Sequence, residues 1–296
     1  MNRVAVYGGL GNQMFQYAFC LALNHNGKKT SISFSNFLYY NHHSGFNLCQ
    51  AFKIRLSFPL NLLNYFLLNG EFLYKNRIAA FFLRNLIQGY QRKRYGIYKE
   101  KKECVYDRDV FNQHSKLFIG IWQVEEYFNN IKDLVLREFD FNVPEDNKNR
   151  EIIEKINNSN SVSIHIRRGD YLNNDWVNLL GVIKGTTYYT NSISYIENKV
   201  SNPHYFIFSD DIQWAKDNLK LTNCTYIDHN KGRDSYIDMY LMSLCKNNII
   251  ANSTFSWWGA WLNKNQDKIV IMPVRWINRE HCGGIFPQKW VKIEVE

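Results

Sequence analysis

Hydrophobic residues recur along this chain with two different periods. Between residues 161 and 166, Val162, Ile164 and Ile166 alternate with polar residues, which is typical of a β-strand. Comparable stretches predict strands at residues 3–7, 30–34, 117–122, 205–208, 224–227, 248–251 and 268–272. Hydrophobic residues spaced by three or four predict helices at residues 13–24, 187–198, 214–219, 235–245 and 256–263, and mainly helical structure between residues 52 and 91.

The order of these elements indicates the fold class. Strands and helices alternate with short connections, most clearly after residue 150, and this alternation favours parallel βαβ units. An acidic, Asn-rich stretch that contains Pro144 runs from residue 142 to residue 150 and predicts a domain junction. We therefore expect an α/β protein with two Rossmann-type halves, an N-terminal domain at residues 1–145 and a C-terminal domain at residues 146–296.

Four clusters of polar residues follow predicted strands directly. They lie at residues 8–13, 165–170, 209–211 and 252–256. In open α/β sheets, ligands bind beyond the carboxyl ends of the strands. The coincidence of four such clusters with four strand ends therefore predicts a binding site.

The first cluster, Gly8-Gly9-Leu10-Gly11-Asn12, is not a dinucleotide-binding fingerprint. Counted from Gly9, the third glycine position of that fingerprint is Met14, and no acidic residue ends the second predicted strand. Glycines let the backbone approach a ligand closely, and the Asn12 amide offers both a donor and an acceptor. A plain tight turn before a helix is the alternative interpretation.

The second cluster contains two arginines and an aspartate. Arg167 carries a permanently charged, forked donor that suits a diphosphate, whereas Arg168 begins the turn. Asp170 could orient an arginine or act as a base, and an Arg–Asp ion pair that only shapes the loop is the alternative. The tripeptide from Arg168 to Asp170 also spells an adhesion motif, but three residues recur readily by chance.

The two remaining clusters suggest an anion site. Residues 252–256 precede a predicted helix, and hydroxyls with free backbone N–H groups at a helix N-terminus bind anions. Ordinary N-capping by these hydroxyls is the alternative. Asp210-Asp211 resembles an acidic metal pair but has no further acidic or histidine partner nearby in sequence, so we expect no metal. Asp238, in a predicted helix, is either solvated or paired with a nucleobase.

The composition gives the chain a positive net charge, which does not identify a particular ligand. Thirty-six Lys and Arg against 27 Asp and Glu give a net charge of +9, which suits nucleic acid, an anionic membrane surface or a phosphate-bearing ligand. The six cysteines lie far apart, so we expect buried thiols in a reducing compartment and no disulfide framework. A strand and turn at the N-terminus, in place of a signal peptide, lead us to expect a cytoplasmic protein.

The most apolar stretch, residues 58–68, is not expected to span a membrane. It is far shorter than the roughly 20 apolar residues that a span needs, and it contains Asn61 and Asn64. It predicts amphipathic helical structure that either packs on the protein or lies on a membrane surface.

Taken in order, the four clusters resemble the α1,2-fucosyltransferase family. The matching motifs are GGLGNQMFQYA at residues 8–18, HIRRGDY at 165–171, FSDD at 208–211 and NSTFSWW at 252–258. The resemblance spans nearly the whole chain, except that residues 40–110 match no known pattern. It implies a GT-B architecture, in which two Rossmann-like domains face a central cleft, and metal-independent, inverting transfer of fucose from GDP-β-L-fucose.

The resemblance also implies roles for individual residues. Arg167 would contact the β-phosphate, and His165 and Asp238 would contact guanosine. Gly11 and Asn12 would act near the fucose from the N-terminal domain. The other expected donor-binding residues are Arg168, Asp210, Asp211, Ser253, Thr254, Phe255 and Ser256. The expected catalytic residues are Arg167, Asn12 and Asp170, with Asp170 as the general base and a mechanism without a strong base left open.

The predicted function is that of a galactoside α1,2-L-fucosyltransferase. The enzyme would move fucose to the 2-hydroxyl of a terminal β-galactose, in a lipopolysaccharide or other surface-polysaccharide repeat unit. Its expected partners are GDP-L-fucose, the glycan acceptor and the inner face of an anionic membrane, with no nucleic acid, cofactor or metal. The alternatives are a fucosyltransferase of another linkage and a non-catalytic module that binds a sugar nucleotide or glycan.

Overall fold

The computed structural model describes residues 1–38, 45–56, 77–169, 171–172, 176–279 and 282–295. The chain divides into two compact units. Unit 1 comprises Met1–Asn142 with Gly283–Ile285, and unit 2 comprises Val143–Cys282 with Phe286–Glu296.

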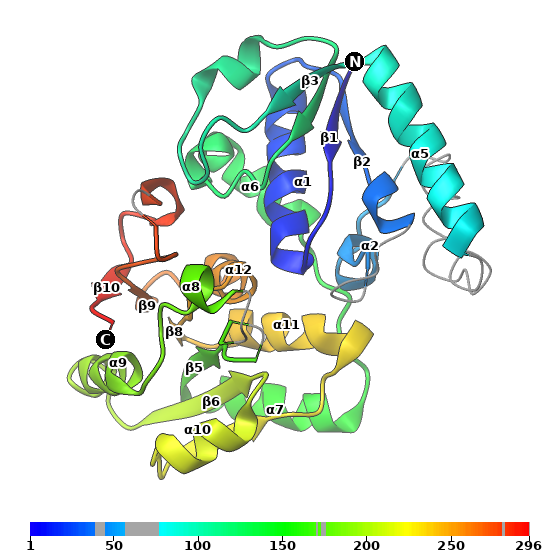
Figure 1. The fold of residues 1–296 in the computed structure, drawn as a ribbon. Helices are drawn as coiled ribbons and strands as arrows, with labels where there is room; N and C mark the ends of the chain where they lie inside the picture. Colours follow the sequence, from blue (N-terminus) through cyan, green and yellow to red (C-terminus); the bar gives the residue numbers. More distant parts are fainter. Residues whose placement is uncertain (39–44, 57–76, 170, 173–175, 280–281, 296) are drawn as a thin grey trace. The chain divides into compact units, whose positions relative to one another are not determined.

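Unit 1 contains a four-stranded parallel sheet in the order β2-β1-β4-β3. In Figure 1, the long helix α1 runs alongside this sheet. The strands are β1 (Asn2–Ala5), β2 (Thr30–Ser33), β3 (Gly96–Lys99) and β4 (Lys116–Ile119). The α-helices are α1 (Leu10–His25), α2 (Leu48–Ala51), α5 (Arg77–Arg94) and α6 (Lys132–Glu138), and short 3₁₀ helices include Ser35–Leu38, Arg108–Asn112, Glu125–Tyr127 and Asn129–Ile131.

An aromatic cluster forms the core of unit 1. Phe19, on the buried face of α1, stacks on Trp122 with 4.2 Å between ring centroids and contacts Phe118 and Tyr127 edge-on. All four side chains are almost completely buried. Because aromatic rings bury a large apolar area, this cluster fixes α1, and with it the glycine-rich turn that precedes it, against the sheet.

Unit 2 contains a six-stranded parallel sheet in the order β10-β9-β8-β5-β6-β7. The strands are β5 (Asn160–Ile166), β6 (Pro203–Ser209), β7 (Cys224–Ile227), β8 (Asn247–Ile249), β9 (Val270–Pro273) and β10 (Val291–Ile293). The α-helices of unit 2 are α7 (Asn147–Asn157), α8 (Val177–Leu180), α9 (Thr187–Glu197), α10 (Ile212–Asn218), α11 (Tyr236–Leu244) and α12 (Thr254–Leu262), and Gly232–Ser235 is a 3₁₀ helix. The 3₁₀ helix Gly283–Ile285 belongs to unit 1.

This strand order contains a topological switch. If β5 is counted as the first strand, the sheet has the doubly wound order 3-2-1-4-5-6, which reverses direction between β5 and β8. Val162 and Ile164 of β5 pair with Asn247 and Ile249 of β8 across that point. Ligands of doubly wound sheets bind beyond the carboxyl ends of the two strands at the switch. In unit 2 these ends lead into residues 165–168 and 250–256.

Most predicted elements agree with the structure to within a few residues, and the predicted α/β class with two Rossmann-like units is confirmed. Helix α1 begins three residues before the predicted start, so Gly11 and Asn12 lie in its first turn. Strands β3 and β10 and helices α6 and α7 were not predicted. Asp146 caps α7 by accepting from the backbone N–H of Asn149, so a helix begins inside the expected junction. The sequence predicts mainly helical structure between residues 52 and 91. Residues 57–76 of this region lie outside the residues that the structure describes, and α5 covers most of the other residues of the region.

The cysteine prediction is wrong for two of the six residues. Cys104 and Cys282 are each disulfide-bonded, whereas Cys20, Cys49, Cys224 and Cys245 are free. Their large separation in sequence gave no spacing signal for this bond. Among the described residues, no helix combines the length and apolar character that a membrane span requires.

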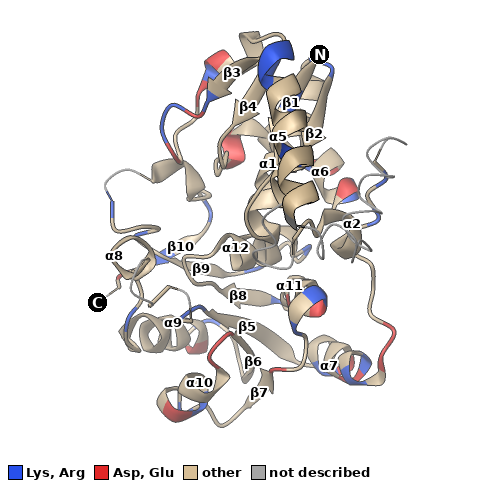
Figure 2. Cartoon of the chain, turned by 45° about the vertical axis from the view of Figure 1, so that its right-hand side comes forward, with Lys and Arg blue, Asp and Glu red and all other residues tan. Residues whose placement is uncertain are grey.

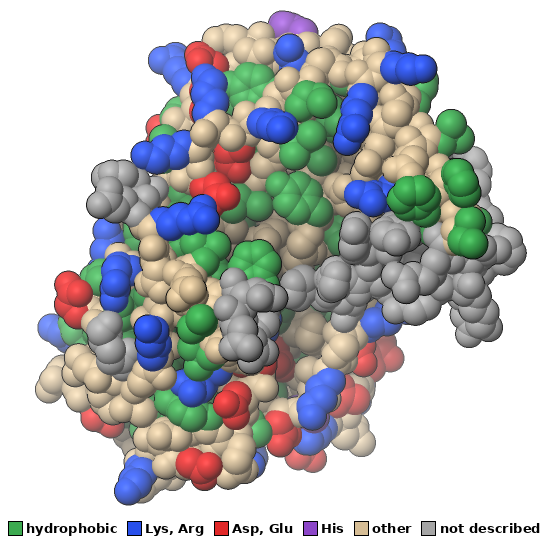
Figure 3. All heavy atoms as spheres, in the orientation of Figure 1, with side chains coloured by type: hydrophobic (Ala, Val, Ile, Leu, Met, Phe, Trp, Pro, Cys, Tyr) green, Lys and Arg blue, Asp and Glu red, His purple; other side chains and the backbone are tan. Residues whose placement is uncertain are grey.

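Helix α5 packs on unit 1 through polar contacts. Gln91 donates to the Ser33 hydroxyl at 2.7 Å, and Gln88 donates to the Asn36 amide oxygen at 3.1 Å. Figure 2 marks basic residues at the C-terminal end of α5, and Figure 3 shows hydrophobic side chains gathered on the outer surface of its N-terminal half.

Candidate donor site in unit 2

The loop after β5 is held by one carboxylate from the loop after β6. Asp210 accepts from the backbone N–H of Arg168 at 2.9 Å and from that of Gly169 at 3.1 Å. Its Oδ2 also pairs with Nε of Arg167 at 3.3 Å. Because β5 and β6 pair in parallel along their full lengths, their carboxyl ends bring these residues together. Asp210 therefore organises the arginine loop.

The two arginines have different surroundings. Arg168 stacks on Trp214 with 4.0 Å between its guanidinium carbon and the ring centroid, and it donates to the Lys184 carbonyl at 2.8 Å. It also lies 3.6 Å from Asp211, whose carboxylate caps α10 by accepting from the Trp214 N–H. Arg168 and Asp211 thus make intramolecular contacts that shape the loop. The Arg167 side chain is 28% exposed and is the better placed of the two to receive an anion.

Replacing Asp210 by alanine is expected to lower kcat/KM about tenfold, since a loop that loses its organising carboxylate no longer positions Arg167 reproducibly. The melting temperature should change little, because Asp210 is partly exposed and outside the core. Asp217→Ala, which removes an exposed carboxylate of α10 that accepts from Gln213 of the same helix, is the matched control. Steady-state kinetics on both variants tests the assignment, and equal rates would contradict it.

The N-terminus of α12 faces the switch point without a side-chain cap. Ser253 occupies the N-cap position, but its hydroxyl makes no capping hydrogen bond, and Ser256 donates to the Ser253 carbonyl at 3.2 Å. Asn252 fixes the preceding turn by donating to the carbonyls of Leu180 and Trp276. The sequence alternative of ordinary N-capping by Ser253 does not apply here. A helix start with uncapped N–H groups and a positive dipole end is suited to a phosphate.

His165 links the end of β5 to this helix start. Its ring centroid lies 5.8 Å from that of Phe255, in the first turn of α12. The side chain is buried, and its Nδ1 has no hydrogen-bond partner among the described residues. Burial, reinforced by Arg167, lowers the pKa of His165 to about 3, so the imidazole is neutral at physiological pH. A buried, unpaired ring nitrogen at a strand end is readily explained by a ligand that supplies the missing partner.

Asp238 belongs to a polar network beyond the carboxyl end of β7. Asn230 donates to the Asp238 carboxylate at 2.8 Å and to the Asn149 amide oxygen at 3.1 Å. His229 also contacts Asn149, while its Nδ1 lacks a partner among the described residues. Loss of solvation raises the pKa of Asp238 to about 7, and the nearby Asp228 adds to this effect, whereas the Asn230 hydrogen bond opposes it. Asp238 is therefore an enclosed carboxyl group and not a solvated one.

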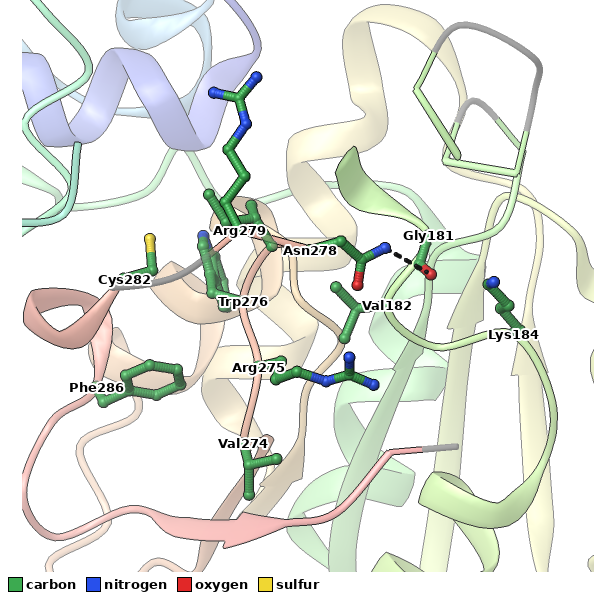
Figure 4. Close-up of a pocket in the computed structure, with 11 residues that line it drawn as sticks. Gly181, Val182, Lys184, Val274, Arg275, Trp276, Asn278, Arg279, Cys282 and Phe286 are labelled. Carbon is green, nitrogen blue, oxygen red and sulfur yellow. Dashed lines mark hydrogen bonds between the residues drawn. The ribbon is translucent and has the colours of Figure 1, made fainter. Parts of the chain in front are cut away.

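A pocket of about 670 Å³ adjoins these loops on the β9 side. Figure 4 shows Lys184, from the loop after α8, and Arg275, from the loop after β9, among the side chains that line it. Arg279 is a third basic residue of the lining, and none of the described lining residues is acidic. Two hydrogen bonds connect the pocket to the neighbouring loops. Arg168 of the arginine loop donates to the Lys184 carbonyl, and Asn252 of the α12 turn donates to the Trp276 carbonyl. The described lining of the pocket is thus basic and suited to an anionic group.

In unit 1, the glycine-rich turn is built around Asn12 and Gln13. Gly8 has a φ of +80°, and a Cβ on it would lie 2.8 Å from Nδ2 of Asn12, so a larger residue is disfavoured there. Gln13 donates to the carbonyls of Gly8 and Gly45, and Asn12 accepts from Nε2 of Gln123 at 2.9 Å. The turn is therefore pre-organised, with Gly11 buried in the first turn of α1.

Glu100 is a candidate site residue that the sequence analysis missed. It directly follows β3 and accepts from the backbone N–H groups of Ile121 and Trp122, just beyond β4. Burial raises its pKa to about 7, and the hydrogen bonds oppose that shift. The missing signal was β3 itself, since a carboxylate immediately after a strand of a parallel sheet would have been included with the other strand-end clusters.

The structure brings together many of the residues predicted for the donor site. Around the β5–β8 switch it places residues from the loops after β5, β6 and β8: His165, Arg167, Arg168, Asp210, Asp211 and Ser253–Ser256. Asp238 lies in the separate network after β7. Gly11 and Asn12 belong to unit 1, and Asp170 lies outside the described residues. Among the described residues, no group of three or more His, Cys, Asp and Glu is arranged to hold a metal ion.

A doubly wound sheet with cationic loops and an uncapped helix start at its switch point defines a protein that binds a phosphorylated nucleotide or sugar nucleotide. The chain belongs to glycosyl transferase family 11, whose family model matches residues 1–294, and it is therefore a glycosyltransferase. The resemblance to α1,2-fucosyltransferases found in the sequence is confirmed at the level of this family.

Two full-length relatives come from Escherichia coli. The chain is 34% identical over 301 residues to an alpha-1,2-colitosyltransferase, with 97% of each chain covered. It is 32% identical over 305 residues to the O-antigen biosynthesis glycosyltransferase WbnK, covering 97% of this chain and 98% of that protein. Human galactoside alpha-(1,2)-fucosyltransferase 1 is 25% identical over 103 residues, 34% of this chain and 28% of that protein.

Among solved structures, the NodZ alpha-1,6-fucosyltransferase co-crystallized with GDP is similar to this chain. Its TM-score is 0.46 at 13% sequence identity, with 87% of this chain and 91% of that chain covered.

Proposed function

We propose that this glycosyltransferase transfers L-fucose from GDP-β-L-fucose to the 2-hydroxyl of a terminal β-galactose, with inversion at the anomeric carbon. The observation that carries the proposal is the uncapped N-terminus of α12 beside His165, at the same switch point as Arg167. A diphosphate between these groups would meet a guanidinium and a helix N-terminus. The α1,2 linkage is supported by the similarity to an alpha-1,2-colitosyltransferase and to galactoside alpha-(1,2)-fucosyltransferase 1.

The chemistry requires stabilisation of a leaving diphosphate. As the anomeric C–O bond breaks, negative charge develops on the diphosphate and positive charge on the sugar. Arg167 and the N–H groups of α12 are proposed to stabilise the former, and such electrostatic stabilisation is usually the largest contribution to catalysis. The acceptor hydroxyl attacks from the opposite face and loses its proton to a base, for which Asp170 is the candidate from the sequence.

A donor comparison tests the proposal directly. Transfer from GDP-fucose to lactose or a related galactoside, with an α1,2-linked product identified by NMR, is the expected result. The second candidate donor is GDP-colitose, which the 34% identity to the alpha-1,2-colitosyltransferase favours. Colitose lacks the 3-hydroxyl of fucose, so a site that pairs with this hydroxyl discriminates strongly between the two donors. A higher kcat/KM for GDP-colitose would show that colitose, and not fucose, is the transferred sugar. Binding of the donor with neither transfer nor hydrolysis would favour the non-catalytic alternative.

The natural acceptor is proposed to be a galactose-terminated repeat unit of a surface polysaccharide. Similarity over nearly the whole chain to the O-antigen biosynthesis glycosyltransferase WbnK supports this class of acceptor. A panel of β-galactosides that differ in the residue beneath the galactose would define the preferred linkage.

Activity is expected to persist in a chelator. Arg167 and the α12 N-terminus can supply the positive charge that a metal ion supplies to the diphosphate in metal-dependent transferases. Asp210 and Asp211 are both engaged with the arginine loop. Rates measured with excess EDTA should equal those without it. Loss of activity in EDTA with recovery in Mg²⁺ or Mn²⁺ would require a metal site that includes these aspartates.

GDP affinity is expected to increase with pH through Asp238. Guanine N–H donors would bind the ionised carboxylate, whereas the free protein has its Asp238 pKa raised to about 7. Below this pKa, GDP binding must release a proton, so affinity should fall about tenfold between pH 8 and pH 6. Calorimetry at several pH values, in buffers of different ionisation enthalpy, measures both the affinity and the number of protons released.

Asp238→Asn provides the control for this dependence. The terminal phosphate of GDP also titrates near pH 6, but that contribution is common to both proteins. The variant should bind GDP more weakly at pH 8 and lose the additional pH dependence. The variant should also resist unfolding at neutral pH better than the unchanged protein. A carboxyl group whose pKa is raised by folding destabilises the folded state as pH rises from about 4 to 7, and the substitution removes this effect. Identical pH profiles would exclude Asp238 from the guanine site.

A further inference from the structure

Helix α5 has an apolar face that points away from unit 1. Ile78, Phe82 and Leu86 follow one another at intervals of four residues, and their side chains are 71%, 67% and 71% exposed. Tyr90 continues this row at 64% exposure, and Phe81 lies beside it at 43%. Residues four apart share one face of a helix, so these five side chains form one continuous stripe. We call it the α5 stripe.

The opposite side of α5 is mixed in composition, and Leu83 and Ile87 are half-buried on it. Ala80 is buried there, and Gln88 and Gln91 make the hydrogen bonds to Asn36 and Ser33. In a typical surface helix, the apolar residues face the core and the polar residues face water. Helix α5 departs from this pattern, because several of its largest hydrophobic residues face outward. A large exposed apolar patch on a soluble domain marks an interaction surface.

The charged residues of α5 itself are all positive. Arg92, Lys93 and Arg94 are exposed in the last turn of the helix, and residues 77–94 contain no acidic residue. In Figure 2, this end of α5 is basic, and in Figure 3 the hydrophobic side chains lie on the outer surface of its other end. Projection on a helical wheel places Arg92 and Lys93 within the same angular sector as the α5 stripe. The exposed face of α5 thus combines large hydrophobic side chains with positively charged ones.

We propose that α5 docks the enzyme on an anionic bilayer surface, with the α5 stripe inserted among the lipids and Arg92, Lys93 and Arg94 paired with headgroups. Apolar residues on one face and basic residues beside them are what an interfacial helix requires. A protein partner with an acidic rim would also suit the charge. The bilayer is favoured because the stripe is a single convex row of side chains on one helix, and a bilayer requires no shape complementarity. This role does not depend on which sugar is transferred.

Vesicle co-sedimentation of the full chain tests the proposal. The protein should bind vesicles of phosphatidylcholine with 30% phosphatidylglycerol and bind pure phosphatidylcholine vesicles much more weakly. Each basic residue near an anionic surface contributes about a fivefold gain in partitioning. The triple variant Arg92→Gln/Lys93→Gln/Arg94→Gln should therefore lower the partition coefficient about 100-fold. Phe82→Ser/Leu86→Ser should also abolish measurable binding, while activity on a soluble galactoside remains unchanged in both variants.

Matched variants away from α5 serve as controls. Lys199→Gln/Lys220→Gln/Lys264→Gln removes three exposed cations from unit 2, and Val105→Ser/Val143→Ser removes two exposed valines. Both should bind vesicles as the unchanged protein does. Loss of binding in the charge control equal to that in the α5 triple variant would show that only the net charge matters, and the proposal would be wrong.

Two other occupants of the α5 stripe give different results. If a second copy of the chain covers it, Phe82→Ser/Leu86→Ser converts a dimer to a monomer in analytical ultracentrifugation, and the unchanged protein does not bind vesicles. If another segment of the same chain covers it, the double variant lowers the melting temperature by several degrees, again without vesicle binding by the unchanged protein. Either outcome overturns membrane docking.

Discussion

Replacing Arg167 by alanine is expected to lower kcat by about two to three orders of magnitude, the effect typical of losing one donor that stabilises developing negative charge. The fold should persist, because Asp210 still accepts from the backbone N–H groups of Arg168 and Gly169 without the Arg167 side chain. Melting temperature and circular dichroism verify that point. Steady-state rates at saturating GDP-fucose measure the catalytic loss.

Two further variants separate the charge of Arg167 from its shape. Arg167→Lys keeps the positive charge but loses the forked geometry, so its rate should lie between those of the unchanged protein and of Arg167→Ala. Arg150→Ala removes an exposed arginine of α7 and should leave the rate unaffected. Full turnover in Arg167→Ala at saturating donor would show that the diphosphate is stabilised elsewhere in unit 2.

Replacing Asn12 by alanine is expected to reduce kcat about 100-fold while the affinity for GDP changes less than twofold. The proposed nucleotide-binding residues all belong to unit 2, whereas Asn12 lies in the first turn of α1 in unit 1. A group that acts on the sugar as the bond breaks affects the transition state and not the binding of GDP. Calorimetry with GDP, beside a kinetic assay with GDP-fucose, measures the two quantities independently.

Gln123→Ala is the control for this substitution. It removes the hydrogen bond between the Asn12 oxygen and Nε2 of Gln123 but keeps the Asn12 amide itself. Its effect on kcat should therefore be the smaller of the two. If Asn12→Ala lost GDP binding in proportion to its rate, the glycine-rich turn would be part of the nucleotide site, and the division of roles between the two units would be wrong.

Five of the six strands of unit 2 could be predicted because their hydrophobic alternation is strong. Strand β5 pairs on both sides and is almost entirely buried, so its sequence carries the pattern directly. Strand β3 is a four-residue edge strand with mostly exposed side chains, and it gives no such pattern. Helix α7 has a low mean hydropathy and begins within a stretch that was interpreted as a linker.

The position of the site was predictable, but the pairing within it was not. Polar residues after strands identified the loops, because carboxyl ends of parallel strands share one edge of the sheet. Which carboxylate would hold Arg167 depends on strand order and register, which one sequence does not determine. The parallel pairing of β5 with β6 selects Asp210, and the spacing of 42 residues between Arg168 and Asp210 contains no local signal for it. The enclosed state of Asp238 likewise depends on its contact with Asn230.

If Arg167 binds the diphosphate as proposed, its ion pair with Asp210 also affects how GDP leaves the enzyme. In the ligand-free protein, Nε of Arg167 already lies 3.3 Å from a carboxylate oxygen, so an incoming diphosphate competes with Asp210 for the same guanidinium. After transfer, that carboxylate offers Arg167 an alternative partner as GDP dissociates, and no unpaired charge has to be exposed along the way. On the proposed function, weaker retention of GDP after transfer is the expected consequence of this competition.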